Sequence, residues 1–194
     1  MPWIKLLREH GYVVYTVTTN GHWSNQIESG GATLMEWELS RSGRNPITEL
    51  RSILGLAHIL RRIKPDIVQN FHAKPNIYAP IAARLAGVPI TISTVTGLGY
   101  TFVERPDLAA RFAKRLTLAM YSFANRLADE VTFQNIDDMK LLKKGYGLSK
   151  GKGRFISGGS GIGYSNTTLA LSTLLNQKHY AGWIKRDIDS STKF

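Results

Sequence analysis

The chain has 194 residues, of which 43% are hydrophobic and 20% charged, a composition typical of a folded globular protein and not of a disordered one. It has 25 lysines and arginines against 14 acidic residues, a net charge of +11, and no cysteine. Disulfides, thiolate metal sites and cysteine nucleophiles are therefore excluded. No window approaches the roughly 18 uninterrupted apolar residues of a membrane-spanning helix. Residues 1–15 also lack the pattern of a signal peptide.

The positive charge favours a polyanionic partner, such as nucleic acid, an anionic membrane surface or a phosphorylated substrate. Basic residues gather in three runs, at residues 41–64, 105–126 and 140–154, and the last run contains no acidic residue. Each run taken alone is equally well explained as a solvated face. No helix-turn-helix, zinc-finger, RNP or KH signature occurs, so a nucleic-acid partner is not expected.

Short β-branched runs alternate with helical periods along the chain, which is typical of βαβ units with a parallel sheet. Helices are predicted up to residue 10 and at residues 46–64, 78–86, 108–127 and 137–144. Strands are predicted at residues 12–17, 32–39, 66–71, 89–95, 131–134 and 154–157. The predicted fold class is therefore α/β, with a Rossmann-like parallel sheet and flanking helices.

The longest predicted helix, at residues 108–127, has a clear helical period of apolar residues. Its apolar residues recur at helical spacing and form one stripe: Leu108, Phe112, Leu116, Ala119, Met120, Phe123 and Leu127. The stripe indicates an amphipathic helix.

The first predicted element is a helix, whereas a Rossmann-like domain begins with a strand. In the doubly wound strand order 3-2-1-4-5-6, that first strand lies in the middle of the sheet. Each backbone group left buried and unpaired without it would cost on the order of 1–3 kcal/mol. We therefore predict that the first strand is missing, so that either the true start lies upstream or the chain is a fragment.

Two loops that follow predicted strands contain the candidate ligand-binding residues. They are His72, Lys74, Thr96, Gly97, Leu98 and Gly99. Open α/β sheets bind ligands beyond the carboxyl ends of their strands, where these loops lie. The two glycines permit positive φ and close backbone approach, and lysine is a point charge suited to phosphate. The alternatives are a tight turn without a ligand, a hydrogen-bonded histidine at a strand end, and a solvated lysine.

Four segments in this order carry a family resemblance. They are residues 64–78 (KPDIVQNFHAKPNIY), 82–89 (AARLAGVP), 93–102 (STVTGLGYTF) and 133–138 (FQNIDD). Together they resemble the N-terminal, acceptor-side domain of GT-B-fold glycosyltransferases of the family 4 type. The closest resemblance is to the branch that acts on lipid-linked glycans and on exopolysaccharide or lipopolysaccharide precursors in bacteria. The resemblance covers roughly residues 2–163, and we interpret residues 1–163 as one glycosyltransferase 4-like domain, incomplete at its start.

The resemblance implies that the intact enzyme transfers a sugar from a nucleotide-sugar to a lipid-linked or carbohydrate acceptor. It implies that the six candidate loop residues contact the acceptor. Related enzymes often carry a histidine directly after the strand equivalent to residues 89–95, and Thr96 stands there in this chain, so no catalytic residue is assigned. The family binds the nucleotide-sugar on a C-terminal donor domain, which would be joined in cis or be a separate chain. We expect this chain alone to be inactive and to bind no metal or cofactor.

The resemblance also implies a peripheral protein at the inner, cytoplasmic face of the plasma membrane. Arg111, Lys114 and Arg115 of the predicted helix 108–127 would face anionic lipid, where each basic residue contributes about 1 kcal/mol of attraction.

Residues 157–163 match the family's hinge, but residues 164–194 lose all resemblance. We interpret residues 164–194 as a tail of no recognised family, which would be explained if this part of the gene were translated out of frame. The alternative functions are a non-catalytic acceptor-binding subunit of a split glycosyltransferase and, on charge alone, a basic nucleic-acid-binding module.

Overall fold

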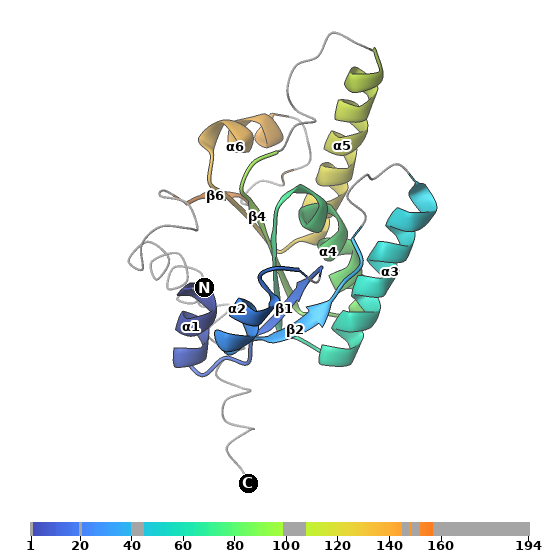
Figure 1. Cartoon of the computed structure of the whole chain (residues 1–194). Helices are drawn as coiled ribbons and strands as arrows, with labels where there is room; N and C mark the ends of the chain where they lie inside the picture. Colours follow the sequence, from blue (N-terminus) through green and yellow to red (C-terminus); the bar gives the residue numbers. More distant parts are fainter. Residues whose placement is uncertain are drawn as a thin grey trace. The chain divides into compact units, whose positions relative to one another are not determined.

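The computed structural model describes residues 2–19, 21–39, 45–98, 108–144, 148 and 152–156 (Figure 1). Every helix and strand reported below belongs to one unit of the chain, residues 1–155. The hinge-like segment and the tail, residues 157–194, lie outside the described residues, and so does Gly99.

Helices and strands alternate along the described chain, as predicted except for the short helix at Ser24–Ser29, which the sequence analysis did not identify. The helices are α1 (Pro2–Glu9), α2 (Ser24–Ser29), α3 (Pro46–Ile63), α4 (Ala73–Ala86), α5 (Leu108–Leu127) and α6 (Ile136–Lys143). The strands are β1 (Tyr15–Thr18), β2 (Thr33–Glu36), β3 (Ile67–Phe71), β4 (Ile90–Val95), β5 (Glu130–Phe133) and β6 (Arg154–Phe155). The prediction of an α/β fold is confirmed.

All strand pairs are parallel, and they form two sheets, one with the order β1-β2 and the other with the order β3-β4-β5-β6. In the larger sheet Ile92 of β4 lies beside both Gln69 and Glu130. Among the described residues no strand pair joins the two sheets.

Asparagine residues cap two helices. Asn45 accepts a hydrogen bond from the backbone N–H of Ile47 at 3.0 Å, and Asn135 accepts one from Asp137 at 2.9 Å. Pro46 occupies the first position of α3, where no intrahelical N–H is needed. The same tolerance explains why α4 begins five residues before the predicted start, because Pro75 lies in its first turn.

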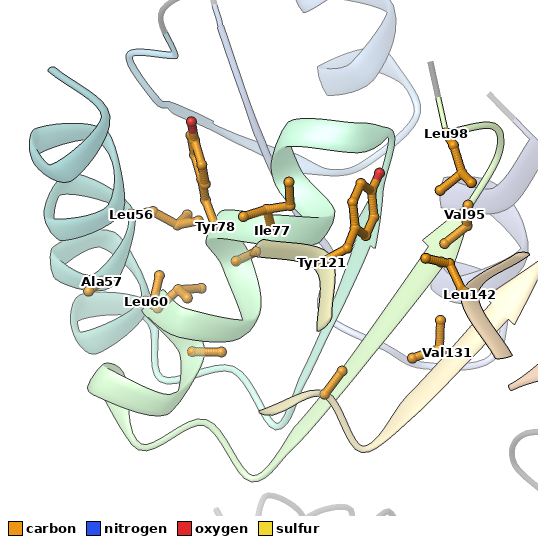
Figure 2. Packing of buried hydrophobic residues seen from close by; sticks show 14 of the residues in the cluster. Leu56, Ala57, Leu60, Ile77, Tyr78, Val95, Leu98, Tyr121, Val131 and Leu142 are labelled. Carbon is orange, nitrogen blue, oxygen red and sulfur yellow. The ribbon is translucent and has the colours of Figure 1, made fainter. Parts of the chain in front are cut away.

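The main core lies between the larger sheet and its helices. Figure 2 labels members from α3, α4, α5, α6, the strands and the loop after β4: Leu56, Ala57, Leu60, Ile77, Tyr78, Val95, Leu98, Tyr121, Val131 and Leu142. Strands β4 and β5 are buried at every residue. Buried strands of this kind form the rigid base from which the loops at their carboxyl ends emerge.

Helix α5 has two apolar faces, and the structure buries the one that the sequence reading did not single out. Leu118, Tyr121 and Ala124 are buried. Phe112, Leu116 and Phe123 of the predicted stripe are 70%, 52% and 53% exposed. The α4 helix packs against the first face and leaves the second in contact with solvent.

The smaller sheet is attached to the main core through α3. The Trp37 indole Nε1 donates a hydrogen bond to the carbonyl oxygen of Ser52 at 2.8 Å, and the Ser52 hydroxyl donates one to the carbonyl oxygen of Glu38 at 3.0 Å. Val17 and Leu39 also pack against the main core. These contacts hold β1 and β2 next to the larger body.

We predict that Trp37→Phe destabilises the chain by about 1–2 kcal/mol, because it removes the indole hydrogen bond to α3 and makes a buried side chain smaller. Urea unfolding followed by circular dichroism measures the loss. Trp23→Phe, at an exposed tryptophan, is the matched control and should change the free energy of unfolding by less than about 0.5 kcal/mol. Equal effects of the two substitutions would contradict the proposed attachment.

Candidate functional site

The carboxyl ends of β3, β4 and β5 place three loops at one edge of the larger sheet. His72 follows β3, Thr96 follows β4 and Gln134 follows β5. Parallel pairing in register puts these ends side by side. The His72 Nδ1 atom lies 3.3 Å from the Thr96 Oγ1 atom, so the structure brings together two residues that are separated in the sequence.

His72 has an unusual backbone conformation. Its φ is 69° and its ψ is 167°, a region that is essentially restricted to glycine. A residue held there costs on the order of 1–3 kcal/mol, and such outliers cluster at functional sites. His72 is also the N-cap of α4, yet its exposed side chain makes no capping hydrogen bond. The imidazole lies instead beside the Thr96 hydroxyl.

A second group of polar residues lies between α3 and α4 and joins the predicted Lys74 to two residues that the sequence reading missed, Glu49 and Tyr78. Glu49, in the first turn of α3, forms an ion pair with Lys74 at 3.2 Å and accepts a hydrogen bond from the Tyr78 hydroxyl. The Lys74 ammonium also lies 5.9 Å from the centre of the Tyr78 ring. The Glu49 side chain is 14% exposed and that of Lys74 is 28% exposed. Glu49 thus fixes the position of Lys74 and offsets part of its charge.

Tyr78 is neutral at physiological pH in this setting. Burial raises the pKa of the Tyr78 hydroxyl, and the hydrogen bond to Glu49 and its negative charge raise it further. The packing of α3 on α4 brings Glu49 to Lys74 and Tyr78. Nothing in the sequence around Glu49 indicates these partners.

The loop after β4 is held by its own apolar residue. The Leu98 side chain is 4% exposed and packs in the core close to Val95 and Leu142 (Figure 2), so a contact of Leu98 with the acceptor would have to be made by its backbone. Gly97 does not adopt positive φ, and a Cβ atom there would meet no atom within 4 Å, so the turn itself does not require glycine at this position. Apolar burial anchors this loop.

Asp138 ties the same loop to α6. Its carboxylate accepts a hydrogen bond from the backbone N–H of Leu98. Burial raises the pKa of Asp138, the Leu98 hydrogen bond opposes that rise, and the charge of Asp137 adds to it. The third and fourth segments of the family resemblance are therefore joined in space.

Arg111 and Arg115 are exposed on α5, and Lys114 is half-buried. Within the described parts of the chain, no three histidine, aspartate or glutamate side chains form a metal-binding group. No helix among the described residues is long and apolar enough to cross a membrane.

We predict that Glu49→Gln lowers the pKa of Tyr78, because it removes the negative charge that favours the protonated hydroxyl. Tyrosine-selective NMR titration follows the change, with Glu28→Gln on the exposed face of α2 as the control. The pKa of the folded state is raised above the value of about 10 for an unfolded tyrosine. The stabilising contribution of Tyr78 is therefore complete below about pH 10 and is lost as the pH rises further. An unchanged Tyr78 titration in Glu49→Gln would contradict the contact.

Comparisons with known proteins agree with the resemblance seen in the sequence. Residues 1–135 match the family model described as Glycosyl transferase 4-like. The chain is 24% identical over 152 residues to the N,N'-diacetylbacillosaminyl-diphospho-undecaprenol alpha-1,3-N-acetylgalactosaminyltransferase of Campylobacter jejuni, an alignment that covers 78% of this chain and 40% of that protein. It is 39% identical over 62 residues to the UDP-Gal:alpha-D-GlcNAc-diphosphoundecaprenol alpha-1,3-galactosyltransferase of Escherichia coli, covering 32% of this chain and 16% of the relative.

A solved structure shares the fold. A glycosyltransferase from Rickettsia africae ESF-5 superposes with a TM-score of 0.54 at 14% identity, and the match covers 89% of this chain and 44% of that one. This chain thus spans less than half the length of each of these proteins. Because the family model matches most of the sequence, the chain belongs to the Glycosyl transferase 4-like family.

Proposed function

We propose that the protein transfers a sugar from a nucleotide-sugar donor to a sugar-bearing lipid diphosphate, and that this domain binds the lipid-linked acceptor. The names of both curated relatives contain a sugar joined to undecaprenol through diphosphate. A diphosphate is a compact anion, so its site needs hydrogen-bond donors and positive potential. The chain supplies positive potential overall through its net charge of +11.

The strained His72 beside Thr96 carries the proposal. The acceptor diphosphate would lie at the N-terminus of α4, where the helix dipole favours negative charge. The imidazole of His72 and the hydroxyl of Thr96 would donate to it from the ends of two adjacent strands. Lys74, held by Glu49 in the first turn of the same helix, would add charge at the rim.

In this proposal the sugar donor binds elsewhere in the whole protein, and the acceptor site sets which hydroxyl faces it. Positioning of this kind is a large part of catalysis when two substrates must meet in one geometry. His72 and Thr96 are binding residues here, and no proton transfer is assigned to either of them.

We further propose that α5 lies on an anionic membrane surface, which would present the lipid-linked acceptor to the site. Its exposed stripe of Phe112, Leu116 and Phe123 is apolar, and Arg111 and Arg115 are exposed next to it. The helix contains four basic residues and no acidic one. Apolar side chains inserted at the headgroup level, flanked by arginines that bind lipid phosphates, are the features of an interfacial helix.

We predict opposite effects of His72→Gly on stability and on acceptor binding. Glycine adopts the observed φ and ψ freely, so the substitution relieves the backbone strain. The relief is partly offset by the entropic cost of fixing a glycine, and the net stabilisation of the fold should be about 1 kcal/mol. Loss of the imidazole should weaken binding of a farnesyl-diphosphate-linked N-acetylglucosamine about tenfold, the equivalent of one hydrogen bond. Thermal unfolding and isothermal titration calorimetry measure the two effects.

Two control variants separate the roles of His72. His72→Ala keeps the strain and loses the imidazole, so it should lose affinity without gaining stability. His58→Ala, on the exposed part of α3, should change neither property. Unchanged affinity in both His72 variants would overturn the proposed acceptor site.

We predict that Phe112→Ser combined with Leu116→Ser lowers binding to vesicles containing anionic phospholipid at least about tenfold, because about 1.5–3 kcal/mol of apolar transfer is lost per side chain. Arg111→Gln with Arg115→Gln should remove most of the salt dependence, at about 1 kcal/mol per residue. Co-sedimentation measures both effects. Ile47→Ser with Leu54→Ser, on the exposed face of α3, is the matched control. If the α3 and α5 variants bind vesicles equally, the α5 surface is not the membrane contact.

A further inference from the structure

An exposed aromatic side chain is held on a hydrogen-bonded turn beyond the carboxyl end of β1. Trp23 is 58% exposed, and its ring meets that of His22 edge to face, with the centroids 5.5 Å apart and the planes at 77°. The Ser24 hydroxyl donates a hydrogen bond to the carbonyl oxygen of Gly21 at 2.8 Å, and the Gly21 backbone N–H donates one to the Ser24 hydroxyl oxygen at 3.2 Å. A large ring that is exposed and already positioned can bind a ligand at a small entropic cost.

The exposed carboxylate of Glu36 lies at the same level of this layer. Helix α2 packs on β2, where Ile27 and Leu34 belong to one apolar cluster (Figure 1). The helix of a βαβ unit runs back along its strands. From the cluster, Trp23 is about 6 Å away towards the start of α2. Glu36 is about 6.6 Å away towards the end of β2, on the same face as Leu34. Trp23 and Glu36 therefore flank one point at the carboxyl end of the smaller sheet.

The carboxyl ends of both sheets are anchored to the first two turns of α3. At the end of β2, Trp37 donates to the carbonyl oxygen of Ser52, and its backbone N–H donates to the carbonyl oxygen of Thr18 at the end of β1. Beyond the end of β3, Lys74 pairs with Glu49. Glu49 and Ser52 are only about 4.5 Å apart along the helix axis. The loop after β1 thus lies on the same side of the fold as the loop after β3.

We propose that Trp23 and Glu36 form a sugar-binding subsite, which holds the sugar of the acceptor whose diphosphate lies at His72 and Thr96. The inference rests on the proposed function and adds the residues that recognise the sugar. The face of an indole ring carries partial negative charge, so it attracts the C–H bonds that line one face of a pyranose, and stacking removes apolar surface from water. The Glu36 carboxylate would accept hydrogen bonds from hydroxyl or acetamido groups at the rim of the same ring.

The test compares farnesyl-diphosphate-linked N-acetylglucosamine with farnesyl diphosphate, which lacks the sugar, by isothermal titration calorimetry. Trp23→Ala should weaken binding of the sugar-bearing ligand about tenfold and leave binding of farnesyl diphosphate unchanged. Glu36→Gln should weaken binding of the sugar-bearing ligand about fivefold, because the hydrogen bonds lose their charge. Tyr15→Ala, an exposed ring at the opposite end of β1, and Glu28→Gln, an exposed carboxylate on α2, are the matched controls.

The sugar subsite and the diphosphate site can fail separately in these titrations. His72→Ala should weaken binding of both ligands. If it does so while Trp23→Ala binds the sugar-bearing ligand like the unmodified chain, the sugar subsite is overturned and the acceptor site stands. Equal losses for the two ligands in Trp23→Ala would also overturn the subsite. A sugar-dependent loss in Trp23→Ala, with both ligands unaffected by His72→Ala, would support the subsite and contradict the diphosphate site.

A measurement on the unmodified chain needs no variant to bind or to fold differently. The NMR signal of the Trp23 indole N–H, assigned by its absence from the spectrum of Trp23→Phe, is followed as the methyl glycoside of N-acetylglucosamine is added. We expect a saturable shift of this signal and none of the signal of Trp37, whose indole is buried and bonded to Ser52. An unchanged Trp23 signal, or an equal shift of both signals, would overturn the proposal.

Discussion

The parallel register of β3, β4 and β5 is the constraint on which the rest of this structure depends. Backbone hydrogen bonds align the three strands so that their carboxyl ends meet at one edge of the sheet. That alignment brings His72 and Thr96 into contact and places the backbone N–H of Leu98 within reach of Asp138. The site is thus built by main-chain geometry, and its side chains occupy positions that the ladder has already fixed. The same ladder carries the strain at His72, because a strained residue persists only where its surroundings determine its conformation.

The charged residues at this edge of the sheet have to attract an anion without destabilising the fold. Lys74 would bring positive charge to the start of α4, but a lysine that is largely buried pays for desolvation unless it is paired. Glu49 supplies the partner, and the neutral Tyr78 hydroxyl completes the carboxylate's hydrogen bonding. A fully neutralised lysine would add little to anion binding, so the dipole of α4 and the donors on His72 and Thr96 carry most of the proposed interaction. The proposed acceptor site would therefore rely on directed hydrogen bonds more than on net charge.

The sequence predicted the order and type of most elements because apolar periodicity and turn residues act locally. The α3 helix follows from Asn45, Pro46 and the period up to Ile63, and no tertiary information is needed to see it. Periodicity did not decide which face of α5 is buried, since two apolar faces compete and the packing of α4 selects between them. Leu98 was predicted as a contact residue because loops at strand ends often bind ligands, whereas its side chain fills the core.

The least predictable feature of the site was the partnership of Glu49 with Lys74 and Tyr78. Its members lie on two helices, and the helix packing that joins them is not encoded in any local pattern. The resemblance segments 93–102 and 133–138 were identified separately in the sequence, and the hydrogen bond between Leu98 and Asp138 that links them could not be predicted from it. Local rules thus identified the strand ends, and tertiary packing determined which side chains work together there.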